Sequence, residues 1–115
     1  MIQFDFYTEG VKIESYVSKI VSKVDKLDIL VNNAGVNTRG NFRDITNEDV
    51  REMALVNTYP YTLLTKALLP KLEKGSMIIN ICSVISQGPS AYDALYAATK
   101  VFEVYTFESL RHENL

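Results

Sequence analysis

The chain has 115 residues, of which 47% are apolar and 23% are charged, with only five glycines and three prolines, so intrinsic disorder and collagen-like repetition are excluded. Its length allows one domain at most, and its apolar fraction is sufficient to build a core. Twelve basic and fourteen acidic side chains give a net charge of −2, without the cluster of Lys or Arg that binding to nucleic acid requires.

Three elements are predicted in the first third of the chain. Residues 2–6 form a short aromatic and β-branched run that predicts a strand, followed by a polar loop over residues 7–10. From Val11 to Val24, apolar residues recur three or four positions apart among charged residues, which is typical of an amphipathic helix. Residues 27–31 predict a strand buried on both faces, which ends at the loop over residues 32–35.

A long helix with an interruption is predicted next. Thr46 can cap its first turn, which also holds acidic residues that favour the positive end of the helix dipole. The apolar pattern continues to residues 74–75, a lysine followed by a glycine, which is a typical helix end. Pro60 removes a backbone donor and clashes with the preceding turn, so we expect a kink or break near Asn57.

The last two elements complete an alternating order. Residues 77–82 predict a third strand, and residues 93–111 predict a final helix after a loop that contains a glycine and a proline. The order is therefore strand, helix, strand, helix, strand, helix. Because a crossover between parallel strands needs a helix to return the chain, this order predicts an α/β fold: part of a doubly wound, Rossmann-type parallel sheet with helices on both faces.

The sequence contains one cysteine, Cys82, and one histidine, His112, so neither an internal disulfide nor a cysteine–histidine metal site is expected. A lone thiol favours a reducing compartment, and we expect the protein in the cytoplasm. No stretch approaches the roughly 18 consecutive apolar residues of a membrane span, and residues 1–6 lack the layout of a secretion signal. We therefore expect no membrane contact from this segment.

Polar side chains stand at the end of each predicted strand. Asp5 ends the first, residues 32–35 follow the second, and Ser83 follows the third. In open parallel sheets, ligands bind beyond the carboxyl ends of the strands. For any one of these clusters, simple loop composition is the favoured explanation, whereas their repetition at every strand end favours a binding site.

Tyr96 and Lys100 lie four residues apart on the last predicted helix and therefore share one face. An unperturbed phenol ionises near pH ~10, and a nearby ammonium stabilises the phenolate. A tyrosine in this position can give a proton to a carbonyl oxygen or take one from a hydroxyl. Because this spacing also arises by chance in a chain with 7 tyrosines, it needs the support of other residues.

Ser83 and Asn57 offer that support, and each also has a simpler explanation. Ser83 would place a hydroxyl at a strand tip, where it could hold a substrate oxygen beside the tyrosine, or it only ends the strand. Asn57 would lie at the helix interruption, where its amide could hold a water that links the lysine to solvent. Alternatively, Asn57 only tolerates the bend caused by Pro60.

Four elements in this order resemble the short-chain dehydrogenase/reductase family. The loop Asn32-Asn33-Ala34-Gly35 matches the family's strand-ending motif, Asn57 its active-site asparagine, Ser83 its catalytic serine, and Tyr96 with Lys100 its Tyr-x-x-x-Lys pair. The spacings agree, since Asn57 and Ser83 are 26 positions apart and Ser83 and Tyr96 are 13 apart. Residues 5–6 and 109–113 are also similar to reductases of 3-oxoacyl-CoA and steroids, which suggests lipid metabolism.

The resemblance implies hydride transfer between a nicotinamide cofactor, NADP or NAD with NADP slightly favoured, and a small carbonyl or alcohol substrate. Tyr96 would be the acid and base, and Lys100 would favour its phenolate and hold the nicotinamide ribose. Ser83 would orient the substrate oxygen, and Asn57 would anchor a proton relay. The remaining cofactor contacts, along the adenosine, would come from Asp5, Asn32, Ala34 and Gly35. A homo-oligomer is also implied, through the helices that carry Asn57 and Tyr96.

Two parts of the family pattern are missing from the sequence. The Thr-Gly-x-x-x-Gly-x-Gly turn that binds the pyrophosphate is absent, and so is everything that follows Leu115 in the family. Residues 1–115 would then be the central part of one Rossmann-type dehydrogenase domain, truncated at both ends, with the third, fourth and fifth strands of a seven-stranded sheet.

Two hypotheses follow from this mapping. The chain is a segment of an active oxidoreductase, or it is a non-catalytic truncated product or an oligomerisation module. An anchor preceding Met1 would change the expected location to the cytosolic face of the endoplasmic reticulum membrane.

Overall fold

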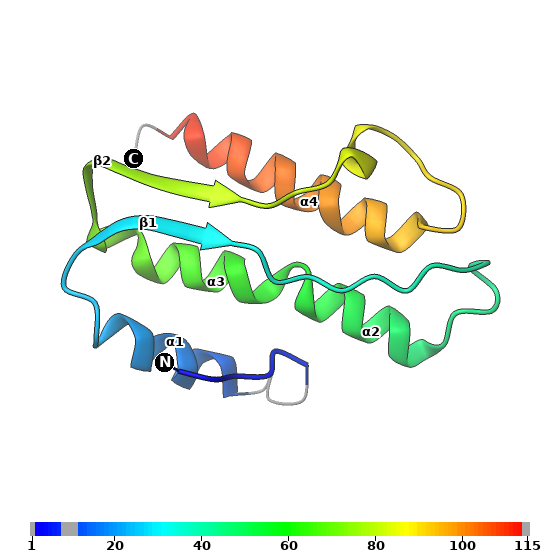
Figure 1. Cartoon of the computed structure of the whole chain (residues 1–115), viewed down its shortest axis with the longest axis horizontal. Coiled ribbons are helices and arrows are strands. Elements are labelled where there is room, and N and C mark those ends of the chain that lie inside the picture. The colour runs from blue at the N-terminus through cyan, green and yellow to red at the C-terminus, as the bar shows by residue number, and fades with distance from the viewer. Residues whose placement is uncertain (1, 8–11, 114–115) are drawn as a thin grey trace.

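The computed structural model, which describes residues 2–7 and 12–113, confirms an α/β fold in which helices flank a parallel sheet. Strands β1 (Leu27–Asn32) and β2 (Leu72–Asn80) pair in parallel. The helices, which Figure 1 shows beside these strands, are α1 (Ile13–Val21) before β1, α2 (Asn47–Val56) and α3 (Tyr59–Leu68) between the strands, and α4 (Ala94–Arg111) after β2. The last helix therefore begins and ends within one residue of its prediction.

The predicted break in the long helix is confirmed. Asn57 and Thr58 separate α2 from α3. Pro60 lies in the first turn of α3, where a backbone N–H has no partner within the helix, so the proline costs no hydrogen bond there. At the other end of α2, Thr46 and Asp49 form a capping box. Short-range signals in the sequence therefore set both ends of α2.

The end of α3 differs from the prediction. The helix stops at Leu68 and not at residues 74–75, and the short 3-10 turn η2 (Leu69–Lys71) follows it. Pro70 lies in this turn, and a proline cannot donate the backbone hydrogen bond that would extend the α-helix. The apolar pattern continued past this point because residues 72–80 belong to a strand.

β2 is correspondingly longer than predicted at its start, and it ends at Asn80 before the predicted end at Cys82. The pairing of β2 with β1 is irregular at the start, because the register shifts between Leu27 and Ile29. Gly75 lies in the matching part of β2 with φ of 97°, a conformation that glycine adopts without strain. From Ile29 onward the two strands pair regularly as far as Asn32 and Asn80, so their carboxyl ends lie side by side.

The strand predicted over residues 2–6 is wrong. Residues 2–5 have no regular structure, and Phe4 stacks on Tyr16 of α1 with ring centroids 4.2 Å apart. In a doubly wound sheet the third strand neighbours the second and not the fourth, so a segment in the third position has no strand partner among residues 12–113. The predicted loop over residues 8–10 and the predicted helix start at Val11 lie outside the described residues.

The prediction of a sheet covered on both faces is also wrong for the described residues. Ile29, Val31, Met77 and Ile79 alternate along the two strands and are 49%, 54%, 54% and 39% exposed. The alternate positions face the helices, as the hydrogen bond from Asn32 to Thr65 of α3 indicates. The described helices therefore cover one face of the sheet. None of these helices is both long and apolar enough to cross a membrane.

Acidification is expected to weaken the start of α2. Asp49 accepts hydrogen bonds from the Thr46 hydroxyl, the Thr46 amide and the Thr38 hydroxyl, at 2.6, 2.8 and 3.0 Å, and these bonds hold its pKa below the ordinary value of 3.8. Because the pKa is lower in the folded state, this stabilisation is complete above about pH 4 and is lost as the pH falls through the folded-state value.

Denaturant unfolding of the wild type and Asp49→Asn between neutral and acidic pH measures this effect. The wild type should lose more stability on acidification than the variant, which cannot ionise at this position. Equal acid dependence in the two proteins would contradict the assignment.

Candidate active site

The candidate site forms where β1 and β2 end. Asn32 and Asn80 occupy the last positions of the two strands, and the Asn32 amide donates to the Asn80 side-chain oxygen at 2.8 Å. The same amide donates to the Thr65 hydroxyl at 3.1 Å, which ties the strand ends to α3. Asn32 is therefore buried, and its side-chain amide makes hydrogen bonds that stabilise the fold.

Asn57 is fully buried at the break between α2 and α3. Its side-chain oxygen accepts from the Val36 amide, and its nitrogen donates to the Val36 carbonyl, both at 2.8 Å. The same nitrogen donates to the Thr99 hydroxyl of α4 at 3.1 Å. Asn57 thus joins the loop after β1 to the helix that carries Tyr96. Its side chain therefore does more than tolerate the bend caused by Pro60.

Tyr96 and Lys100 lie on one face of α4, as their spacing predicts. The Lys100 nitrogen is 5.9 Å from the centre of the Tyr96 ring. Lys100 is 3% exposed, and its ammonium donates to the Ile81 carbonyl at 3.1 Å and to the Glu103 carboxylate at 2.8 Å. Two of its three N–H donors have partners among the described residues in this way, which leaves one further donor.

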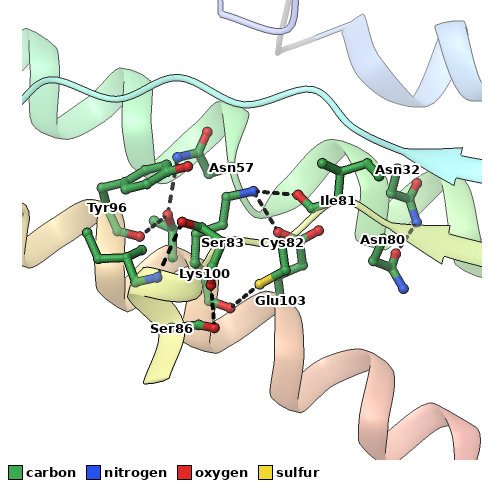
Figure 2. A network of polar contacts seen from close by, with 12 residues as sticks. Asn32, Asn57, Asn80, Ile81, Cys82, Ser83, Ser86, Tyr96, Lys100 and Glu103 are labelled. Carbon is green, nitrogen blue, oxygen red and sulfur yellow. Dashed lines mark hydrogen bonds and ion pairs between the residues drawn. The ribbon is translucent and has the colours of Figure 1, made fainter. Parts of the chain in front are cut away.

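Ser83 precedes the short 3-10 turn η3 (Val84–Gln87) and lies three residues after the end of β2. Its hydroxyl oxygen accepts from the Ile85 amide at 3.3 Å, and its carbonyl accepts from the Ser86 hydroxyl at 2.7 Å. Figure 2 shows Ser83, Tyr96, Lys100 and Asn57 gathered around the end of β2. The four residues matched to the family's active site therefore lie in one cluster, although they come from three separate segments.

The loop after β1 passes close to this cluster. A Cβ atom on Gly35 would lie 3.4 Å from the Asn57 oxygen and 3.7 Å from the Lys100 nitrogen. A side chain at this position would therefore stand over the lysine, and glycine leaves that approach open to a ligand. Ala34 beside it is exposed.

Asp5 does not join the cluster. It is exposed, and its carboxylate accepts from the Tyr7 amide at 2.8 Å. Residues 2–7 lie beside α1, and in Figure 1 α3 and both strands separate them from α4. Within the described residues, this segment is therefore remote from the other residues proposed from the sequence.

Glu103 is the residue that sequence reasoning missed. It is 1% exposed and pairs with Lys100 one turn further along α4. Glu103 lies on the side of α4 where Ala97, Thr99 and Lys100 are also buried, and its spacing of three from Lys100 does not by itself reveal this burial. In the described part of the chain, no group of three or more His, Cys, Asp or Glu side chains is arranged to hold a metal.

The buried hydroxyl of Tyr61 in α3 is expected to destabilise the folded state. The residue is 4% exposed, and its oxygen has no hydrogen-bond partner among the described residues. Burial raises its pKa above the ordinary value, and the charges of Glu103 and Cys82 raise it further. Because the raised pKa belongs to the folded state, wild-type stability is intact below about pH 10 and declines as the pH rises above it.

Tyr61→Phe should therefore raise the free energy of unfolding by about 1 kcal/mol at neutral pH, since it removes an unsatisfied group and keeps the ring. The variant should also lose less stability than the wild type in alkaline solution. Denaturant unfolding at neutral and alkaline pH measures both effects, and a destabilised variant would contradict the geometry of this hydroxyl.

Comparison with known proteins identifies the family of this chain. A family model described as short chain dehydrogenase matches residues 1–114. The chain belongs to the short-chain dehydrogenase family. Its fold agrees with this membership, since a short-chain dehydrogenase from Burkholderia cenocepacia, solved in complex with NADP, superposes with a TM-score of 0.79 at 28% identity. That alignment covers 94% of this chain and 44% of the other.

Curated members of the short-chain dehydrogenase family are similar to the chain over most of its length. A 3-ketodihydrosphingosine reductase from Bacteroides thetaiotaomicron is 30% identical over 95 residues, which cover 81% of this chain and 35% of the relative. A meso-2,3-butanediol dehydrogenase from Serratia marcescens is 31% identical over 94 residues, covering 81% and 38%. The chain thus spans less than half the length of these relatives.

Proposed function

We propose that this chain is the catalytic segment of an NAD(P)-dependent oxidoreductase that transfers hydride between a nicotinamide and a carbonyl or alcohol. The observation that carries the proposal is the cluster at the end of β2, in which Lys100 lies buried beside Tyr96, with Ser83 and Asn57 adjoining (Figure 2). A nicotinamide would supply the hydride. The protein would supply the proton and the positions of the reacting groups.

Each residue of the cluster has a distinct proposed role. The Tyr96 hydroxyl gives a proton to the carbonyl oxygen during reduction and takes one during oxidation. Lys100 favours the phenolate through its positive charge and offers its remaining N–H to the ribose. The Ser83 hydroxyl donates to the same substrate oxygen, because its own oxygen already accepts from the Ile85 amide. Asn57 holds the loop after β1 in register with α4 and so anchors the relay.

One feature of the structure fits a bound nicotinamide cofactor, the glycine at position 35. Gly35 leaves space above the Lys100 nitrogen and the Asn57 oxygen, where any larger residue would place a Cβ. NADP is slightly favoured over NAD, and the Burkholderia relative solved with NADP supports this choice without excluding NAD. Ala34 and Gly35 are proposed to line the adenosine side, and Asn32 to support them from below.

The substrate is proposed to be a ketone or secondary alcohol of lipid type. The support is the name of one relative, a 3-ketodihydrosphingosine reductase, together with the apolar residues that surround the cluster. Val84 is 82% exposed and Tyr92 is 60% exposed near Ser83 and Tyr96, so an apolar chain would find contacts there.

The test uses the chain expressed together with any sequence that flanks it in its gene. Titration calorimetry with NADPH and NADH should give binding in the micromolar range, tighter for NADPH. Nicotinamide absorbance should then fall when long-chain and short-chain ketones are added. Absence of both binding and turnover would overturn the proposal.

A second candidate is a non-catalytic segment that associates with another copy or subunit. The observation that favours it is the apolar face of the sheet, where Ile29, Val31, Met77 and Ile79 are 49%, 54%, 54% and 39% exposed and another chain could cover them. Calorimetry discriminates, since this candidate predicts no heat with either nucleotide. Sedimentation would then report the association that this candidate requires.

A further inference from the structure

Lys100 and Glu103 form a buried ion pair at the heart of the cluster. Their charged atoms are 2.8 Å apart, and the two residues are 3% and 1% exposed. The other ion pairs of the described residues each include at least one side chain that is more than half exposed. Moving two charges out of water costs free energy unless the charges are close enough to compensate each other. The position of the buried ammonium therefore depends on this carboxylate.

The carboxylate holds the ammonium in one place. Lys100 donates to Glu103 on its own helix and to the Ile81 carbonyl just beyond β2, so two bonds from different elements fix the nitrogen (Figure 2). The nitrogen lies 5.9 Å from the centre of the Tyr96 ring. The direction of the third N–H is thereby set as well.

The carboxylate also offsets the charge of the ammonium. An ammonium beside a phenol favours the phenolate, and a negative charge next to that ammonium opposes the effect. Tyr61 senses the same charge, since Glu103 is among the causes that raise the pKa of Tyr61. The field at Tyr96 is therefore that of a pair and not of a free cation.

We propose that Glu103 is a positioning residue that holds the Lys100 ammonium beside Tyr96 and offsets its positive charge there. The role of Glu103 in catalysis rests on the proposed function, whereas its electrostatic effect on Tyr96 does not. The other charged groups around α4 have partners of their own or are partly exposed: Asp93 with Arg39 and Asn37, Asp49 with Thr46 and Thr38, Glu48 with Arg51, Glu108 with Arg111, and the half-exposed Glu52. Two of the titratable groups do face the pair, since the Cys82 thiol donates to the Lys100 carbonyl at 3.4 Å and the Tyr61 hydroxyl is under the influence of the Glu103 charge.

The experiment follows the ionisation of Tyr96 directly. Tyrosine labelled with carbon-13 at the ring carbon that bears the hydroxyl is titrated by NMR, and the Tyr96 signal is the one missing from Tyr96→Phe. In Glu103→Gln, which keeps an acceptor for Lys100 and removes the charge, this signal should titrate about one pH unit lower than in the wild type. Glu108→Gln, on the exposed side of the same helix, is the matched control and should leave it unchanged.

Glu103→Asp provides a second variant if the loss of charge prevents folding. It keeps the carboxylate but withdraws it by one methylene, and the Tyr96 signal should move in the same direction by a smaller amount. A signal that stays in place or moves to higher pH in the folded variants would overturn the proposal. Because the titration needs no turnover, a shifted signal in a protein that fails to reduce ketones would refute the proposed function alone.

Discussion

Tyr96→Phe is expected to lower the rate of nicotinamide-dependent ketone reduction by a factor of about 10²–10⁴, which is the usual contribution of a positioned acid or base. The substitution removes one oxygen and keeps the ring that lies beside the Lys100 nitrogen. Cofactor affinity should change little, because the loss falls on proton transfer. Steady-state rates and calorimetry on the same preparation separate the two effects.

Tyr105→Phe is the matched control for this substitution. Tyr105 lies on the same helix and is 71% exposed, so its hydroxyl has no part in the cluster. The control should retain full activity. If Tyr96→Phe turned over at the rate of this control, the proton donor would lie elsewhere and the role assigned to Tyr96 would fail.

Local signals predicted most of the helices because a helix satisfies its hydrogen bonds within one segment. The capping box at Thr46 and Asp49 and the proline at position 60 act over a few residues, and the structure places α2 and α3 accordingly. The end of α3 was missed, because the apolar period ran through Pro70 into residues that pair with β1. Periodicity alone does not separate a buried helix turn from the start of a strand.

Whether a strand forms and whether a sheet face is buried depend on segments elsewhere in the protein, which the local sequence does not reveal. Residues 2–6 have the composition of a strand, but a strand needs a neighbouring strand to pair with its backbone N–H and C=O groups. In the structure this segment instead packs through Phe4, whose ring stacks on Tyr16. The same reasoning applies to the sheet face with Ile29 and Met77, which was expected to be covered. Both errors came from assuming contacts that these residues do not have within the described part of the chain.

The cluster could be predicted because its spacing along the chain reflects a fixed topology. Ser83 follows β2, Tyr96 and Lys100 follow on α4, and Asn57 lies at the helix break, so the parallel arrangement brings them together. Glu103 was missed because an acidic residue on a helix is usually solvated, and only its 1% exposure reveals the pair with Lys100. Asp5 lies in the segment over residues 2–7, apart from the cluster, and its predicted contact with the adenosine stays a prediction.

Lys100→Met is expected to lower the free energy of unfolding by about 3–5 kcal/mol, the usual cost of removing one member of a buried ion pair. Methionine replaces most of the volume of the lysine, so packing changes little. The loss comes from Glu103, whose carboxylate is left buried without its cation. Denaturant unfolding at neutral pH measures the change.

The double variant Lys100→Met with Glu103→Leu distinguishes this explanation from a simple loss of packing. Glu103→Leu alone should be destabilising, because it leaves the Lys100 ammonium buried with only the Ile81 carbonyl as an acceptor. The double variant should recover most of the stability, since two apolar side chains of similar volume replace two charges, and a double-mutant cycle then gives a strong coupling between the positions. If the two losses simply added, the pair would not be the reason that Lys100 is held in the core.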